Sequence, residues 1–244
     1  MGVNETEGKV LAIRQVGEDI IHLVVSTQTS PKPGQFYLLR AWQEAPLLGR
    51  PLSVFSFSQG QVEFVFKVVG KGTEILGKLK VEDEIQLQGP YGNGFPEVKG
   101  KVLLVGGGLG NVPLHATAKT LVAQGVEVDL RLGFAEETYC AQEFESAATK
   151  TELIVGGLVT DGLDLSGYDA VFTCGPHPMM EAVVNLAKEK GIPSYVSIEK
   201  RMACGIGACL VCTCKTKSGN KKTCKDGPVF EGEEVFYEND DSIS

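Results

Sequence analysis

Short apolar segments alternate with turn residues along residues 1–97 of the chain. In residues 62–68, large apolar side chains alternate with mixed ones, as in a strand that buries one face. Proline and glycine recur at short intervals and divide the region into small pieces. Several short strands between turn signals are typical of a barrel or a sandwich. We therefore predict a small β domain over residues 1–97.

The pattern changes near residue 98, where longer apolar runs begin. Residues 102–105 form a continuous apolar run, which is typical of a strand buried on both faces of a parallel sheet. A helix with one apolar face is predicted over residues 113–124. A second buried strand is predicted over residues 170–173, followed by another helix. Strands that alternate with helices predict a doubly wound, parallel α/β domain over residues 98–197.

Residues 198–244 differ again, because they are rich in cysteine, glycine and lysine. Five of the seven cysteines fall between Cys204 and Cys224. A segment this short buries little apolar core, so it needs another source of stability, such as a bound metal. The fold class is therefore α/β plus all-β, with a small third domain over residues 198–244.

Four of these cysteines have the spacing of an iron–sulfur site. Four residues separate Cys204 from Cys209, and two separate Cys209 from Cys212. Cys224 follows after eleven more residues. The four-then-two step is that of plant-type [2Fe–2S] ligands, whereas zinc ribbons use two separate Cys-x2-Cys steps. The spacing predicts a [2Fe–2S] cluster, with zinc or unrelated free thiols as the alternatives.

The remaining three cysteines are interpreted differently. Cys214 lies two residues after Cys212, so in a strand the two side chains would share a face, and Cys214 is a candidate additional ligand. Cys140 and Cys174 lie in the predicted α/β domain and are interpreted as packed thiols. The lysines of residues 215–225 are interpreted as a solvated hairpin face, with contact to the cluster or to a partner protein as the alternative.

Two glycine-containing turns follow predicted strands of the α/β domain. Residues 106–110 (GGGLG) lie between a strand and a helix, where backbone N–H groups can bind a pyrophosphate. Residues 174–176 (CGP) end the later strand, and carboxyl ends of parallel strands meet at one edge of the sheet. Glycine in a tight turn is weak by itself as an indication of a ligand. The two turns together predict a dinucleotide site formed by Gly106, Gly107, Gly108, Gly110, Cys174, Gly175 and Pro176.

Two motifs in the β domain have groups suited to phosphate. In residues 50–53 (RPLS), Arg50 offers a guanidinium for bidentate contact and Ser53 offers a hydroxyl. Residues 70–73 (GKGT) form another turn rich in backbone amides. Each motif has the alternative of a plain surface turn. Their occurrence together with the dinucleotide turn favours a ligand site.

The overall charge excludes some classes of function. The 31 Asp and Glu residues against 23 Lys and Arg give a net charge of −8, whereas nucleic-acid binding favours clustered positive charge. No apolar run reaches the roughly 18 residues that span a bilayer. The N-terminus lacks the layout of a secretion signal. We expect a cytoplasmic protein that binds neither nucleic acid nor membrane and keeps its cysteines reduced.

Taken together, the motifs resemble a known family. The order of residues 50–53, 106–110 and 174–176 is similar to that of the ferredoxin–NADP reductase superfamily. Three further motifs narrow the resemblance: residues 89–94 (GPYGNG), 202–209 (MACGIGAC) and 224–230 (CKDGPVF). Over essentially the whole chain, the sequence resembles the electron-transfer subunits of class 1B dihydroorotate dehydrogenases.

The resemblance implies an FAD in a Greek-key β-barrel, NAD as a substrate on the α/β domain, and a [2Fe–2S] cluster. Position by position, Arg50 would contact an FAD phosphate and Ser53 would lie near the flavin N5. The other implied FAD contacts are Pro51, Leu52, Val65, Phe66, Lys67, Gly72 and Thr73. The implied cluster ligands are Cys204, Cys209, Cys212 and Cys224. Many members have tyrosine where Leu52 stands, so another group must cover the flavin face.

The resemblance also implies a function, which is hydride exchange between nicotinamide and FAD followed by one-electron steps through the cluster. We identify no acid–base catalyst in the chain, and NAD is expected over NADP, with Arg131 as a conceivable contact for an extra phosphate. In the family, the partner is an FMN-containing subunit that oxidises dihydroorotate in pyrimidine biosynthesis, and the assembly is a heterotetramer. The alternatives are a reductase subunit serving a ferredoxin, hydrogenase or oxygenase, and a zinc-stapled binding module.

Overall fold

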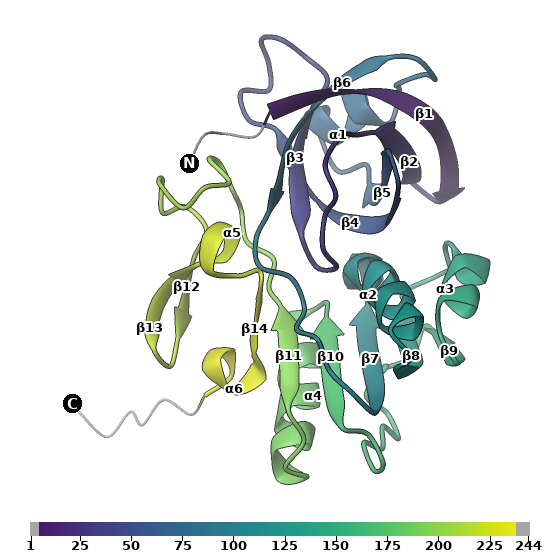
Figure 1. Cartoon of the computed structure of the whole chain (residues 1–244), viewed down its shortest axis with the longest axis vertical. Coiled ribbons are helices and arrows are strands. Elements are labelled where there is room, and N and C mark those ends of the chain that lie inside the picture. The colour runs from purple at the N-terminus through teal and green to yellow at the C-terminus, as the bar shows by residue number, and fades with distance from the viewer. Residues whose placement is uncertain (1–4, 238–244) are drawn as a thin grey trace.

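The computed structural model describes residues 5–237. Within this range the chain forms a β-barrel, a second sheet covered by helices, and a C-terminal unit, by which we mean residues 198–237 (Figure 1). The barrel lies above the second sheet in Figure 1, and the C-terminal unit, in yellow, lies beside both. No helix of residues 5–237 is long and apolar enough to cross a membrane.

Six antiparallel strands close the barrel in the order β1-β2-β5-β4-β3-β6. Val62 and Phe64 lie two residues apart in β5 and are both fully buried, as expected for one face of a pleated strand. The predicted all-β barrel is therefore confirmed. Its strands are β1 (Glu5–Gly17), β2 (Ile20–Ser26), β3 (Phe36–Arg40), β4 (Arg50–Ser58), β5 (Gln61–Lys67) and β6 (Glu84–Tyr91), and α1 (Lys71–Leu76) follows β5.

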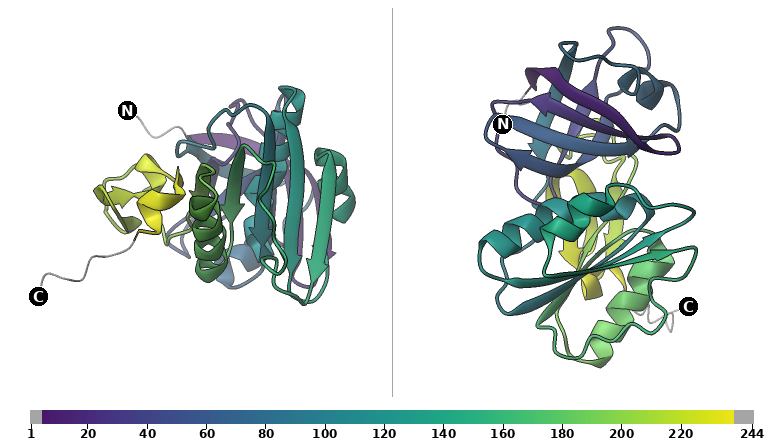
Figure 2. Two further views of the ribbon diagram at one scale, coloured as in Figure 1. Left: turned by 90° about the horizontal axis from the view of Figure 1, so that it is seen from below. Right: turned by 90° about the vertical axis from the view of Figure 1, so that its right-hand side faces the viewer.

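The second sheet has six strands in the order β14-β11-β10-β7-β8-β9, all parallel except β14. Neighbouring residues of β7 pack on opposite faces, with Leu104 against α2 and Leu103 against α4. Figure 2 shows these helices on the two faces, which confirms the doubly wound arrangement. The elements are β7 (Lys101–Gly107), η1 (Gly108–Asn111), α2 (Val112–Ala123), β8 (Glu127–Phe134), α3 (Ala141–Ala147), β9 (Lys150–Val155), β10 (Ala170–Cys174), α4 (His177–Glu189) and β11 (Ser194–Ser197).

The C-terminal unit is fastened to both neighbours. Its strand β14 pairs antiparallel with β11, and Val229 exchanges two hydrogen bonds with the Asn93 side chain, at 2.7 and 3.1 Å. Strand β14 lies in the predicted third domain, yet it belongs to the sheet of the second. The predicted domain limits at residues 97 and 197 therefore stay a prediction. The elements of the unit are β12 (Thr213–Thr216), β13 (Gly219–Lys222), α5 (Thr223–Asp226), β14 (Val229–Glu231) and α6 (Gly232–Val235).

A shared core joins the barrel to the second sheet. Phe55 of β4 stacks on His115 of α2, with ring centroids 4.0 Å apart and ring planes 11° apart. The Nδ1 of His115 donates to the Phe55 carbonyl at 2.8 Å, and burial lowers the pKa of this histidine. Phe55 and Val65 belong to the same buried cluster as the residues of α2. This contact fixes the barrel against the sheet and therefore fixes the space between them.

Candidate functional site

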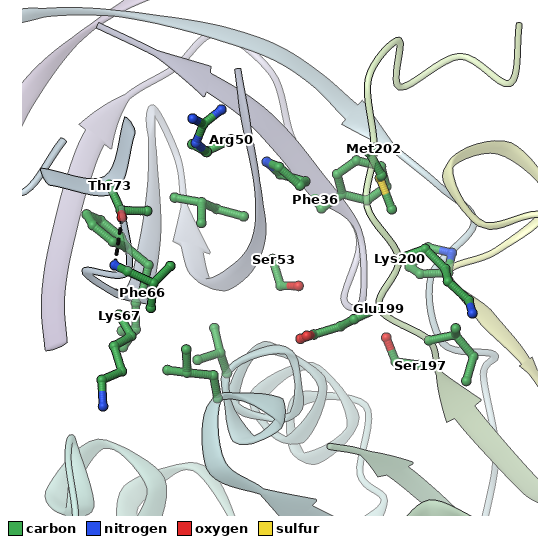
Figure 3. Close-up of a pocket in the computed structure, with 18 residues that line it drawn as sticks. Phe36, Arg50, Ser53, Phe66, Lys67, Thr73, Ser197, Glu199, Lys200 and Met202 are labelled. Carbon is green, nitrogen blue, oxygen red and sulfur yellow. Dashed lines mark hydrogen bonds between the residues drawn. The ribbon is translucent and has the colours of Figure 1, made fainter. Parts of the chain in front are cut away.

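A cleft of about 290 Å³ lies where the barrel, the second sheet and the C-terminal unit meet (Figure 3). Strands β4 and β5 form one wall, to which η1 contributes Leu109 and the start of α2 contributes Val112. The other wall is residues 197–202, which lead from β11 into the C-terminal unit. Eight of the predicted FAD contacts line the cleft: Arg50, Pro51, Leu52, Ser53, Val65, Phe66, Lys67 and Thr73.

The Arg50 guanidinium is available to an anionic ligand. Its Nη1 donates to the Leu48 carbonyl at 2.6 Å, and the guanidinium lies 5.6 Å from the centroid of the Trp42 ring. Within residues 5–237 no acidic side chain forms an ion pair with it. Gly72 lies so close that a Cβ there would collide with the guanidinium. The first N–H groups of a helix have no partner within it, so Arg50 and the start of α1, with Thr73, fit a pyrophosphate.

The two glycine turns pack against each other at the carboxyl edge of the sheet. A Cβ at Gly110 would lie 2.5 Å from the Cα of Gly175 and would collide with the Cys174 carbonyl. A Cβ at Gly107 would lie 3.0 Å from Cδ of Pro176. The two turns therefore lie against each other with no side chain between them, at the sheet edge where such α/β folds bind dinucleotide phosphates. Of the other predicted residues, Gly106 lies in β7 and Gly108 begins η1.

Residues 197–202 form a wall of the cleft that sequence reasoning missed. Glu199 and Ser53 point into the cleft from opposite walls (Figure 3). The Glu199 side chain is exposed because the cleft is open, yet the surrounding protein desolvates the carboxyl and raises its pKa. A signal was available in the sequence, since these residues directly follow a strand of the parallel sheet and ligands bind beyond the carboxyl ends of such strands.

Replacing Glu199 by glutamine is expected to stabilise the protein at neutral and alkaline pH. A carboxyl whose pKa is raised by folding destabilises the folded state once the pH exceeds its ordinary pKa of 4.5, because the ion is desolvated. Below that value the group is protonated in both states and the effect vanishes. The melting temperature of Glu199→Gln should exceed that of the wild type at about pH 8 and approach it toward about pH 5. Equal melting temperatures throughout would contradict a desolvated carboxyl.

The four predicted cluster cysteines gather in the C-terminal unit as two pairs. The Sγ atoms of Cys212 and Cys224 lie 3.2 Å apart. The Sγ of Cys204 accepts the backbone N–H of Cys209 at 3.4 Å. No three of these sulfurs are among the ligand atoms of residues 5–237 that lie within 4.8 Å of one another. Hydrogen bonds therefore join the cysteines as two pairs of residues, Cys204 with Cys209 and Cys212 with Cys224.

The cysteine arrangement is closer to that of a [2Fe–2S] site than to that of a zinc site. A zinc ion with four thiolates would hold every pair of sulfurs about 3.8 Å apart, given a Zn–S distance of about 2.3 Å, whereas no three of these four sulfurs lie within 4.8 Å of one another. The two cysteine pairs fit a [2Fe–2S] cluster, in which two cysteines bind each iron. Burial opposes ionisation of Cys204, but N–H donors of residues 206, 208 and 209 outweigh it and lower its pKa to about 6. Gly207 also donates to Cys224 at 3.1 Å, but burial and the neighbouring Cys212 outweigh this donor and raise the pKa of Cys224 to about 12. The donors around Cys204 favour its thiolate, which is the form in which a cysteine binds iron.

Apolar side chains connect the cleft with the cysteine pairs. Phe36 and Met202 both line the cleft. Phe36 is also part of a small buried cluster with Cys212 and Cys224, against which Met202 packs. The same two side chains therefore contact both the cleft and the group of buried cysteines.

The other cysteines lie apart from this arrangement. Cys214 is buried in β12, and none of the hydrogen bonds described for the four cluster sulfurs involves it. Cys140 and Cys174 are buried in the α/β region, as predicted for packed thiols. Burial raises the pKa of Cys140 to about 12 and raises that of Cys174 as well.

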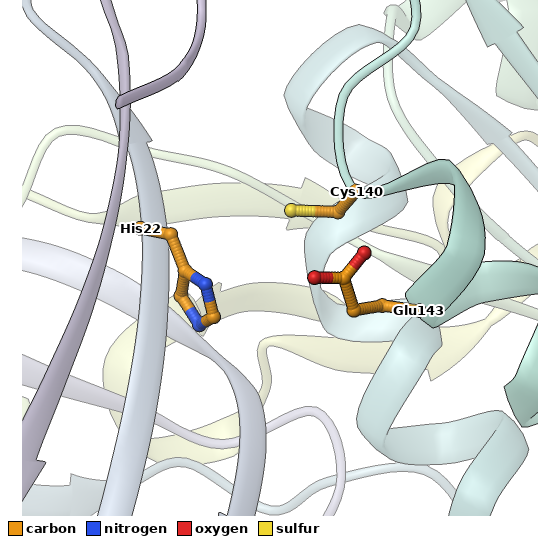
Figure 4. Close-up of side chains that lie close together, drawn as sticks. All are labelled: His22, Cys140 and Glu143. Carbon is orange, nitrogen blue, oxygen red and sulfur yellow. The ribbon is translucent and has the colours of Figure 1, made fainter. Parts of the chain in front are cut away.

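A second group of metal-ligating side chains lies between the barrel and α3. Ligand atoms of His22, Cys140 and Glu143 lie within 4.8 Å of one another (Figure 4). Arg14 already supplies a cation here, since its Nε donates to His22 Nδ1 at 3.2 Å and its guanidinium pairs with Glu143. The Nε2 of His22 lies 2.8 Å from a carboxylate oxygen of Glu63. The group therefore acts as a polar contact between the barrel and the second sheet.

Arg131 is held within the protein. Its Nε donates to the Val159 carbonyl at 2.7 Å, and its terminal nitrogens bind Glu152 at 2.6 Å and the Asp161 carbonyl at 2.5 Å. The guanidinium thereby fastens the loop after β9 to β8. An additional phosphate on the coenzyme would have to compete with these partners.

Comparison with known proteins gives concordant results. Residues 199–236 match a family described as the iron–sulfur cluster binding domain of dihydroorotate dehydrogenase B. The chain is 44% identical over 240 residues to the dihydroorotate dehydrogenase B (NAD(+)) electron transfer subunit of Clostridium acetobutylicum, covering 95% of this chain and 97% of that protein. It is 42% identical over 248 residues to the subunit of the same name from Clostridium perfringens, covering 97% and 100%.

The fold comparison agrees with the sequence comparison. A structure of the NADH-dependent reduced ferredoxin–NADP oxidoreductase, described in connection with flavin-based electron bifurcation, superposes with a TM-score of 0.84. It is 31% identical and covers 93% of this chain and 89% of that one. The sequence identity to the two clostridial proteins is higher and extends over 97% and 100% of their length. The chain therefore belongs to the family of dihydroorotate dehydrogenase B electron transfer subunits.

Proposed function

We propose that this chain is the electron-transfer subunit of an NAD-dependent dihydroorotate dehydrogenase. The observation that carries the proposal is the apolar contact through Phe36 and Met202 between the cleft and the cysteine pairs. It would give a path through apolar side chains from a flavin in the cleft to a cluster on the cysteines. A protein with both cofactors can take two electrons from NADH and pass them one at a time to a partner.

Each part of the site has a separate task in this proposal. Arg50, Gly72 and Thr73 bind the FAD pyrophosphate, and Ser53 offers its hydroxyl to the flavin ring. The two glycine turns bind the NAD phosphates and bring the nicotinamide to the open side of the cleft. The cysteine pairs hold a [2Fe–2S] cluster. When bound, FAD exchanges a hydride with NAD(H) and the cluster transfers single electrons, which is chemistry that the cofactors supply.

The partner in this proposal is an FMN-containing subunit that oxidises dihydroorotate, with two copies of each subunit in a heterotetramer. The names of the clostridial relatives support the dihydroorotate dehydrogenase assignment and NAD as the coenzyme. Residues 1–97, 98–197 and 198–244 would be the FAD, NAD and cluster domains.

A second candidate is a reductase subunit that serves a ferredoxin. The 31% identity and TM-score of 0.84 with the ferredoxin–NADP oxidoreductase favour it. It would use the same cofactors and the same cleft, so the two candidates differ only in the partner that receives or supplies electrons.

Anaerobic co-expression with the dihydroorotate-oxidising subunit tests the proposal. We expect a brown-yellow complex that contains FAD, iron and acid-labile sulfide and that couples dihydroorotate oxidation to NAD reduction. A complex that fails to form, together with NADH-dependent reduction of ferredoxin by the chain alone, would favour the second candidate. A colourless chain with stoichiometric zinc would exclude both.

A further inference from the structure

The hydroxyl of Tyr91 is buried at the border between the barrel and the C-terminal unit. Tyr91 is the last residue of β6, and its Oη has no hydrogen-bond partner among residues 5–237. Native proteins pair nearly all buried hydroxyl groups, because an unpaired donor is destabilising. The hydroxyl is therefore placed for a partner that residues 5–237 do not supply.

The Tyr91 ring lies against the loop that carries the cluster cysteines. A Cβ at Gly205, the residue after Cys204, would lie 2.7 Å from the ring carbon Cε2. The ring also packs against the buried group of Phe36 and Cys224, with the Phe36 centroid 5.9 Å away. A phenol hydroxyl carries its proton at neutral pH and can donate it to a hydrogen bond. A buried, unpaired hydrogen-bond donor therefore lies beside the loop that carries Cys204.

We propose that the Tyr91 hydroxyl donates a hydrogen bond to a sulfur of the [2Fe–2S] cluster and thereby raises the cluster's reduction potential. The proposal rests on the proposed function, because it requires the cluster. A donor stabilises the reduced cluster more than the oxidised one, since the reduced form carries one more negative charge. One electron enters the cluster, no covalent bond is made or broken, and the proton stays on the phenol.

The test is a redox titration of the Tyr91→Phe holoprotein, followed by electron paramagnetic resonance of the reduced cluster. The substitution keeps the ring and its packing and removes only the donor. We expect the equilibrium constant for one-electron reduction of the cluster to fall about three- to tenfold, and its reduction potential to fall with it. A tenfold change corresponds to 59 mV for a one-electron couple. Iron content and the FAD potential should be unchanged.

Tyr37→Phe is the matched control, because its hydroxyl pairs with the Thr29 hydroxyl at 2.7 Å inside the barrel. This variant should leave the cluster potential unchanged. As a second measurement, exchange into D₂O should shift the Fe–S stretching bands of the wild type in resonance Raman spectra more than those of Tyr91→Phe. An unchanged potential in a fully loaded Tyr91→Phe protein would overturn the proposal while leaving the proposed function intact. A wild type without iron would overturn the proposed function itself.

Discussion

Replacing Cys209 by alanine should abolish electron transfer between NADH and the dihydroorotate-oxidising partner. The Cys209 side chain is exposed, so its removal disturbs little packing but removes one of the four proposed thiolate ligands. Even groups that only support metal ligands contribute about 10–100-fold to metal affinity. Loss of a ligand should therefore leave the chain without its cluster and lower the coupled rate by at least about 100-fold.

Electron transfer from NADH to the flavin does not need the cluster, so measuring it distinguishes loss of the cluster from misfolding. Cys209→Ala should still reduce ferricyanide with NADH, because the cleft and the glycine turns are unchanged. Cys214→Ala is the control, since Cys214 lies in the same unit but takes no part in the hydrogen bonds of the cluster sulfurs. Iron and sulfide analysis should give full occupancy in Cys214→Ala and almost none in Cys209→Ala. Full occupancy in Cys209→Ala would remove this residue from the ligand set.

Local patterns in the sequence predicted those elements whose burial follows directly from their own residues. Residues 102–105 form a continuous apolar run because both faces of β7 are covered by helices. The spacing of the cysteines predicted which four come together in the C-terminal unit, because a cluster constrains the loop that wraps it. Similarly, Gly110 had to be glycine because another turn lies against it, and a Gly-rich turn after a strand indicates such a contact.

Features that depend on contacts between distant segments were not predictable in the same way. The wall of residues 197–202 faces the flavin motifs only because the barrel packs on the second sheet. Strand β14 is three residues long, and its pairing with β11 is set by the position of the C-terminal unit rather than by its own pattern. The hydrogen bonds from Arg131 to two backbone carbonyls likewise depend on the loop after β9, which has no repeating pattern of apolar residues.

Replacing Gly110 by alanine should strongly impair the use of NADH. The new methyl group would collide with the Cys174 carbonyl and approach the Cα of Gly175, both of which are backbone and cannot turn aside. Forcing extra volume into a packed contact destabilises by about 1–3 kcal/mol. Here it would also separate the two turns that we propose bind the coenzyme phosphates. We expect the apparent affinity for NADH in stopped-flow flavin reduction to fall by about 10-fold or more.

The effect at Gly110 must be separated from the general effect of adding a methyl group to a glycine. Gly167→Ala is suitable for this, because Gly167 has a left-handed φ of 83° but no neighbour within 4 Å of the new Cβ. It should lower stability by about 1 kcal/mol through backbone strain and leave NADH affinity unchanged. If Gly110→Ala lost stability to the same extent but bound NADH as tightly as the wild type, the two turns would be a folding feature and the coenzyme would bind elsewhere. A loss of affinity in Gly110→Ala alone would assign the phosphate site to the contact between the turns.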